Sequence, residues 1–358
     1  MKELPLTRSF ASRIHDLSHK GRGIRTPFFN ISSQQKEKKL CSKDTSPLVG
    51  EVARRTGEGF LLNNTTTSQE STADDYWRLL KPRVMSLVVF TGIAGLLLAP
   101  GNIHPFIGLI AILCLAVGSG AAGAINMWYE RDIDALMERT KGRPLPQGKL
   151  VPGEALGFGL TLAIGSVIVM YTLVNFWAAF YLMLAILFYV FVYTMWLKRI
   201  TPQNIVIGGA AGALPPVIGW AAVMNETSLF PWVLFGIIFL WTPPHFWALA
   251  LCKHQDYRRA NIPMLPLVRG AKKTKNQILI YIGLLFLLTL FPFFSGDLGK
   301  FYGVSALGLG SLFFCFGIKL KFSSNPHYGM RVFFYSIIYL FLLFTAMIMD
   351  KWRLYELY

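Results

Sequence analysis

The chain has 358 residues, of which 53% are hydrophobic and only 15% are charged, and its mean hydropathy is +0.45. Soluble domains carry about 25% charged residues, so this composition excludes a soluble enzyme and a disordered protein. It predicts an all-α polytopic membrane protein. The formal net charge is +16, but the basic residues gather at the ends of apolar runs, which indicates membrane topology and no nucleic-acid partner.

The first 75 residues differ from the rest of the chain. Residues 1–43 contain ten Lys/Arg against three Asp/Glu and no long apolar core, a pattern typical of a mitochondrial transit peptide. A disordered cytosolic tail is the alternative. Residues 44–75 are polar and predict a flexible linker. We expect the membrane domain to occupy residues 76–358.

Apolar runs of membrane-spanning length follow this leader. We expect nine spans, or eight if the glycine-rich eighth run does not cross. Paired prolines in the fifth and sixth runs predict that both spans are interrupted, as membrane helices are where they line a cavity. The expected spans are 84–100, 104–128, 154–173, 176–197, 204–223, 229–251, 277–295, 301–318 and 332–349.

Charge separates the connections between these spans into two classes. Most Lys/Arg after residue 75 precede the first span or follow the second, fourth, sixth and eighth spans. The positive-inside rule therefore places these connections on one side of the membrane. In a mitochondrial inner membrane that side is the matrix, which the catalytic loops are expected to face.

The connection after the second span holds a cluster of acidic residues. Asn126, Glu130 and Asp134 are spaced i, i+4 and i+8, so a continuing helix places them on one stripe while Asp132 points away. Oxygen ligands at a membrane boundary suit Mg²⁺, which binds through one or two carboxylates and substrate phosphates. The alternative is a solvated helix whose acidic groups pair with Arg131 and Arg139.

Cations follow this cluster at Arg139, Lys141 and Arg143. Guanidinium and ammonium groups directly after a metal site are what diphosphate recognition requires. The alternative is that these cations only set topology.

A second polar segment follows the sixth span. An offset of 122 residues takes Asp134 to Asp256, which suggests duplicated four-helix units with two acidic sites. Asp256 is either part of such a site or a partner of Arg259. His245 directly follows the prolines of the sixth run, so it is expected to face a cavity, either as a hydrogen-bonded helix residue or as a ligand.

Several segments resemble a known superfamily. The segments 126–134 and 139–146 resemble the first acidic motif of the intramembrane (UbiA-type) prenyltransferases. Within that superfamily, other segments are similar to those of the protohaem IX farnesyltransferases (haem O synthases). These are 80–84, 193–199, 204–216 and, most distinctively, 241–266; the whole resemblance covers about residues 76–350.

The resemblance implies a fold and a reaction. The fold is a bundle of nine helices around a central cavity. The reaction transfers a farnesyl group from farnesyl diphosphate to a vinyl group of haem b, forming haem O and diphosphate for the haem A of cytochrome c oxidase. The lipid bilayer and both substrates are the expected partners, and haem A synthase is a candidate partner. The leader would make this the mitochondrial form.

The resemblance also implies residue roles. Asn126, Glu130 and Asp134 would hold Mg²⁺, and Asp256 would hold a second metal ion or orient Lys253. His245 would ligate haem. One departure weakens the second site, because Cys252 stands where many superfamily members carry an aspartate. The expected catalytic residues are Asn126, Glu130, Asp134, Lys198 and Asp256, and the expected diphosphate ligands are Arg139, Arg143, Lys198 and Lys253.

Three other functions compete with this one. An aromatic-acceptor polyprenyltransferase of quinone synthesis shares the first motif but should lack the segment 241–266 in this form. A transporter also has broken helices and polar groups within the membrane, yet it has no need of an acidic triplet followed by cations. A non-catalytic haem-binding membrane scaffold would need a similar cavity.

Overall fold

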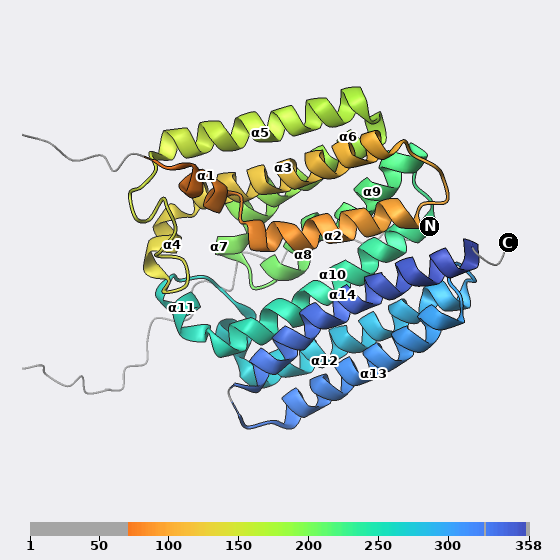
Figure 1. Ribbon diagram of the computed structural model, residues 1–358. Coiled ribbons are helices and arrows are strands. Elements are labelled where there is room, and N and C mark those ends of the chain that lie inside the picture. Colours follow the sequence, from red (N-terminus) through yellow and green to blue (C-terminus); the bar gives the residue numbers. More distant parts are fainter. Residues whose placement is uncertain (1–70, 326, 356–358) are drawn as a thin grey trace, which may run out of the picture. The chain divides into compact units, whose positions relative to one another are not determined.

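The computed structural model describes residues 71–325 and 327–355 (Figure 1). The expected leader 1–43 and nearly all of the linker 44–75 lie outside these residues. Within them the regular structure is helical throughout. The helices are α1 (Ala73–Leu79), α2 (Pro82–Leu98), α3 (Pro105–Tyr129), α4 (Arg131–Leu136), α5 (Pro152–Leu173), α6 (Phe176–Leu187), the π-helix η1 (Phe188–Leu197), α7 (Lys198–Ile200), α8 (Asn204–Ala213), α9 (Pro215–Met224), α10 (Leu229–Cys252), α11 (His254–Arg259), α12 (Leu265–Phe294), α13 (Lys300–Phe322) and α14 (Tyr328–Tyr355).

The described helices confirm a polytopic membrane protein. Eight helical stretches are long and apolar enough to cross a membrane, with α6, η1 and α7 counted as one stretch and α8 and α9 as another. A ninth is added if α1 and α2 form one span bent by 54°. The helix α13 is one of the eight, so the glycine-rich run that raised doubt does qualify as a span. The uncertain span is the first, because Lys81 separates α1 from α2 in a left-handed conformation with φ 54°.

The helix α1 begins slightly earlier than expected. Its first residue is Ala73, so the last three residues that we assigned to the linker are helical. A capping box explains this start, because the Thr72 hydroxyl donates to the Asp75 carboxylate at 2.7 Å and the same carboxylate accepts the Thr72 backbone N–H.

The two proline pairs behave differently. The first separates α8, which ends at Ala213, from α9, which begins at Pro215. The second does not break its helix, since α10 runs unbroken through Pro243 and Pro244, and the expected interruption of the sixth span is wrong. Each proline removes a backbone donor and crowds the carbonyl four residues earlier, but both prolines are buried in α10, which packs against α8, α9, α12 and α14.

The spans form a closed bundle in which α14 contacts α2. Three hydrogen bonds near the end of α14 secure this closure. The buried carboxylate of Asp350 accepts the backbone N–H groups of Gly299 and Tyr302 at the start of α13, and Lys351 donates to the Leu98 carbonyl at the end of α2. The last span thus joins its predecessor to the first span.

The short helices gather at one end of the bundle. Figure 1 shows α1, α4, α7 and α11 there, together with the turn from α13 to α14. These are the connections that carry most of the basic residues. The shared side expected from the positive-inside rule therefore agrees with the arrangement of the helices.

Candidate active site

The acidic stripe forms at the junction of α3 and α4. The Glu130 backbone N–H donates to the Asn126 carbonyl at 3.0 Å, and the Asp134 N–H donates to the Glu130 carbonyl at 2.8 Å. Helical hydrogen bonding therefore continues across the junction, and the i, i+4, i+8 stripe is present as expected. All three side chains are buried, with at most 3% of each residue exposed.

Asp132 points away from this stripe, as its spacing predicts. It is exposed and accepts two hydrogen bonds from the Arg199 guanidinium, at 3.0 Å and 2.9 Å. Partial burial favours the neutral acid, but the hydrogen bonds from Arg199 outweigh it and hold the pKa of Asp132 below its ordinary value.

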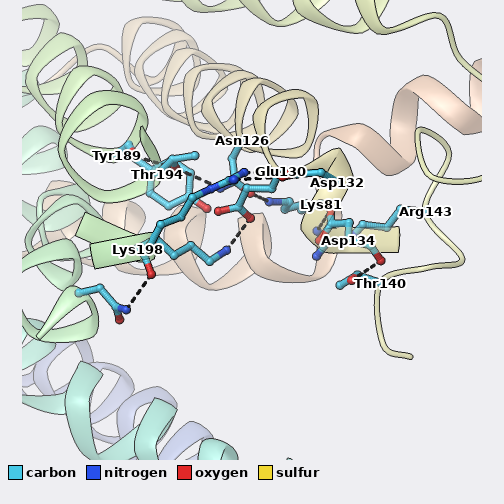
Figure 2. A network of polar contacts seen from close by, with 12 residues as sticks. Lys81, Asn126, Glu130, Asp132, Asp134, Thr140, Arg143, Tyr189, Thr194 and Lys198 are labelled. Carbon is cyan, nitrogen blue, oxygen red and sulfur yellow. Dashed lines mark hydrogen bonds and ion pairs between the residues drawn. The ribbon is translucent and has the colours of Figure 1, made fainter. Parts of the chain in front are cut away.

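Each member of the stripe has a cationic partner (Figure 2). Lys198 Nζ lies 2.5 Å from Glu130 Oε2, Arg143 Nη1 lies 2.6 Å from Asp134 Oδ2, and Lys81 Nζ lies 2.5 Å from Asn126 Oδ1. These cations come from α7, from the loop after α4 and from the break before α2.

The partners are therefore not the two arginines named in the solvated-helix alternative. Arg131 donates instead to the Trp128 carbonyl at 2.7 Å, and Arg139 is exposed. The Thr140 hydroxyl donates to the Asp134 carbonyl at 3.0 Å, which turns the chain back so that Arg143 reaches the stripe. Of the residues involved, sequence analysis did not identify Lys81, whose charge it assigned to topology.

The π-helix η1 supplies a further contact that the sequence did not reveal. The fully buried Thr194 hydroxyl donates to the Tyr189 carbonyl five residues earlier at 2.8 Å and accepts from Asn126 Nδ2 at 3.0 Å. π-Helices are rare and frequently mark functional sites. Here η1 fixes the Asn126 amide and leads directly into Lys198.

The connection after α10 packs against the connection after α3. Ile133 and Met137 share a hydrophobic core with Tyr257 and Ile262, and Arg259 lies 3.5 Å from Glu138. The partner suggested for Asp256 is thus engaged with another acid.

The second polar segment does not complete a metal site with the first. In residues 71–325 and 327–355, no group of three or more His, Cys, Asp and Glu side chains is arranged to hold a metal ion. Asp256 is half-buried and Lys253 is exposed. Their expected roles stay predictions.

The stripe itself fits a divalent cation. Glu130 Oε1 is buried and has no hydrogen-bond partner, although its other oxygen is held by Lys198. Such a buried carboxylate oxygen is costly unless a cation satisfies it. The donors at this position are the amide oxygen of Asn126 and two carboxylates, which are the hard oxygen ligands that Mg²⁺ prefers.

His245 lies within the bundle. Its ring is stacked between those of Trp241 and Phe333, with centroid distances of 4.3 Å and 4.4 Å. Its Nδ1 is 2.7 Å from the Ser336 hydroxyl on α14. The residue is 8% exposed, so it makes the hydrogen bond expected of a buried helix histidine, and its role as a ligand stays a prediction.

Comparison with known proteins assigns the chain to a family. A model described as the UbiA prenyltransferase family matches residues 88–344, which is most of the membrane domain. The chain belongs to the UbiA prenyltransferase family. It is 54% identical over 290 residues to a protoheme IX farnesyltransferase of Granulibacter bethesdensis, covering 78% of this chain and 92% of the relative. It is 55% identical over 279 residues to one of Rickettsia bellii, covering 78% and 93%.

Solved structures of the UbiA family share the fold. A digeranylgeranylglyceryl phosphate synthase has a TM-score of 0.67 at 19% identity and covers 77% of this chain and 97% of its own. A UbiA homologue from Archaeoglobus fulgidus, bound to GPP and Mg²⁺, has a TM-score of 0.55 at 15% identity and covers 76% and 99%. At these identities the likeness shows the fold alone.

Proposed function

We propose that this UbiA-family prenyltransferase transfers a farnesyl group from farnesyl diphosphate to a vinyl group of haem b, forming haem O and diphosphate. The observation that carries the proposal is the buried stripe of Asn126, Glu130 and Asp134 with a cation beside each member. The high identity to protoheme IX farnesyltransferases supports haem b as the acceptor.

Asn126, Glu130 and Asp134 would hold Mg²⁺, whose charge weakens the bond between the farnesyl carbon and the leaving diphosphate. The Mg²⁺ and GPP bound to the Archaeoglobus fulgidus homologue of the same fold support this assignment. Asp256 would hold a second metal ion or orient Lys253.

The cations around the stripe stabilise the departing diphosphate. Arg143 and Lys198 are positioned at the stripe, and Lys81 adds a third charge there. Fixed cations in a water-poor site stabilise developing negative charge more than they would in water. The exposed Arg139 and Lys253 would complete the set of diphosphate ligands.

Breaking the carbon–oxygen bond leaves an allylic cation on the farnesyl group. The half-buried ring of Tyr193 is a suitable partner for it, since Lys198 Nζ already lies 5.8 Å from the ring centroid. The ring packs so closely on Gly208 that a Cβ added there would lie 2.1 Å from it. A cation–π contact of this kind contributes about 1–2 kcal/mol when desolvated. Trp196, another aromatic residue of η1, is 61% exposed.

The haem vinyl group then supplies the electron pair for the new carbon–carbon bond. The resulting cation next to the porphyrin takes up water and releases a proton, which leaves a hydroxyethylfarnesyl group. An apolar environment delays hydrolysis of the first cation. His245 would ligate the haem iron through Nε2.

The deciding experiment gives the purified protein, in lipid nanodiscs with Mg²⁺, farnesyl diphosphate and either haem b or 4-hydroxybenzoate. Formation of haem O from haem b alone supports the proposal. Prenylation of 4-hydroxybenzoate would favour the quinone-type enzyme, and haem binding without diphosphate release would favour the non-catalytic scaffold.

The basic leader supports a mitochondrial inner-membrane location, with the catalytic loops facing the matrix and a haem A synthase receiving haem O. Import of the full chain into isolated mitochondria, compared with a chain lacking residues 1–43, tests the location. Protease protection of the loops tests their side, and co-purification tests the partner.

A further inference from the structure

The oxygens that would bind a divalent cation are also the oxygens that hold three cationic side chains. Lys198 contacts Glu130, and Arg143 contacts Asp134, with both carboxylates at least 96% buried. Lys81 contacts the Asn126 amide oxygen that the metal would need. In this network only Glu130 Oε1 is buried without a partner. A metal ion and the three side chains therefore compete for one set of oxygens.

This competition makes binding of the metal alone unfavourable. A divalent ion seated on the stripe meets the positive charges of Lys198 and Arg143, which already lie within hydrogen-bonding distance of its carboxylate ligands. Displacing Lys198 or Arg143, whose side chains are 17% and 22% exposed, takes it off a carboxylate that is almost fully buried and leaves both charges without that partner. A second anion at the site removes this cost, because its oxygens accept the displaced cations.

We propose that Lys81, Arg143 and Lys198 couple metal binding to diphosphate binding, so that the protein takes up a divalent cation and diphosphate cooperatively and binds the cation alone weakly. The proposal rests on the metal site of the proposed function. It adds that the metal ion and diphosphate bind to this site cooperatively. Because binding free energies are linked, the factor by which diphosphate tightens metal binding equals the factor by which metal tightens diphosphate binding.

The test measures Mn²⁺ binding by electron paramagnetic resonance to the full chain in nanodiscs, with and without inorganic diphosphate. Free Mn²⁺ is compared with the same mixture lacking protein, which corrects for manganese diphosphate in solution. The informative variant is Lys198→Met. Its matched control is Arg199→Met, which removes one positive charge from the neighbouring residue. Arg199 pairs with the exposed Asp132, which is not part of the stripe.

We expect diphosphate to tighten Mn²⁺ binding to the unaltered protein at least tenfold. Lys198→Met should bind Mn²⁺ alone about tenfold more tightly than the unaltered protein and should gain less from diphosphate. Lys198→Arg should retain the coupling because it retains the charge, and Arg199→Met should change neither quantity. A merely structural role for Lys198 predicts weaker, not tighter, Mn²⁺ binding. If Lys198→Met does not fold, Arg143→Met gives the same comparison, because Arg143 also pairs with a buried carboxylate of the stripe.

Two results would overturn the proposal in distinguishable ways. If Lys198→Met binds Mn²⁺ alone no more tightly than the unaltered protein, the coupling is wrong while the metal stripe stands. If the unaltered protein binds no Mn²⁺ even with diphosphate, the stripe is not a metal site, and the metal assignment of the proposed function fails with the coupling.

Discussion

The imidazole of His245 on α10 and the hydroxyl of Ser336 on α14 are joined by a hydrogen bond of 2.7 Å that spans 91 residues of sequence. The same hydroxyl donates to the Phe333 carbonyl at 2.6 Å. Because a serine hydroxyl carries one proton, we assign Nδ1 of His245 as the donor to Ser336. Nε2 of the neutral ring then carries the lone pair that a metal needs.

This relationship predicts the effect of Ser336→Ala on haem. Removing the hydroxyl takes away the acceptor that orients the ring, and loss of such a partner typically weakens metal binding by about 10- to 100-fold. We expect weaker haem binding and an altered Soret band in titrations with haem b, with Ser336→Thr restoring both. His245→Ala should abolish the spectral signature but leave farnesyl diphosphate binding intact. An unchanged spectrum in His245→Ala would remove the histidine from haem ligation.

Asp134→Asn should abolish most haem O formation. The substitution keeps the shape of the side chain but removes its charge, so metal and Arg143 both lose their anionic partner. We expect turnover to fall on the order of 100-fold or more, measured by haem extraction and chromatography. Asp132→Asn is the matched control because Asp132 lies two residues away and pairs with Arg199 on the exposed face. Equal losses in both variants would argue against a special role for the stripe.

Removing divalent cations should stop the reaction reversibly. Chelation with EDTA is expected to abolish haem O formation, and added Mg²⁺ should restore it, because the oxygen ligands of the stripe suit a hard cation. Thermal unfolding followed by tryptophan fluorescence supplies the control. Full turnover in the presence of excess chelator would contradict the metal assignment.

Asp350→Ala should destabilise the bundle without acting on the chemistry. The carboxylate of Asp350 accepts two backbone N–H groups at the start of α13, so its loss leaves them unsatisfied within the protein. Loss of such a cap costs about 1–2 kcal/mol. We expect a lower Tm with turnover per folded molecule unchanged, while the exposed Glu226→Ala, at the same end of the bundle, should change neither. An unaltered Tm would show that the cap is not needed.

The sequence was sufficient for the features that depend on local spacing. Apolar run length predicted the spans, and the i, i+4, i+8 pattern placed Asn126, Glu130 and Asp134 on one stripe with Asp132 turned outward. Such features follow from helix geometry alone, because residues four apart lie on the same face.

The partners of that stripe could not be predicted in the same way. Lys81 and Lys198 reach Asn126 and Glu130 across 45 and 68 residues of sequence, through the packing of separate helices. Charge patterning assigned Lys81 to topology, and although the family resemblance implied a role for Lys198, it did not pair Lys198 with Glu130. The unbroken course of α10 through Pro243 and Pro244 likewise depends on burial by neighbouring helices, which a single segment does not encode.

The π-helical winding of η1 has a consequence for how the protein tolerates change. The π-helix η1 closes its hydrogen bonds over five residues, so its winding differs from that of an α-helix, and removing one residue from the segment 188–197 would change the direction in which the residues beyond it face. Lys198 would then lose its contact with Glu130, although all the other side chains of the segment are unchanged. The number of residues in this stretch is thus itself under constraint, and insertions or deletions there should be far more damaging than substitutions on its lipid-facing side.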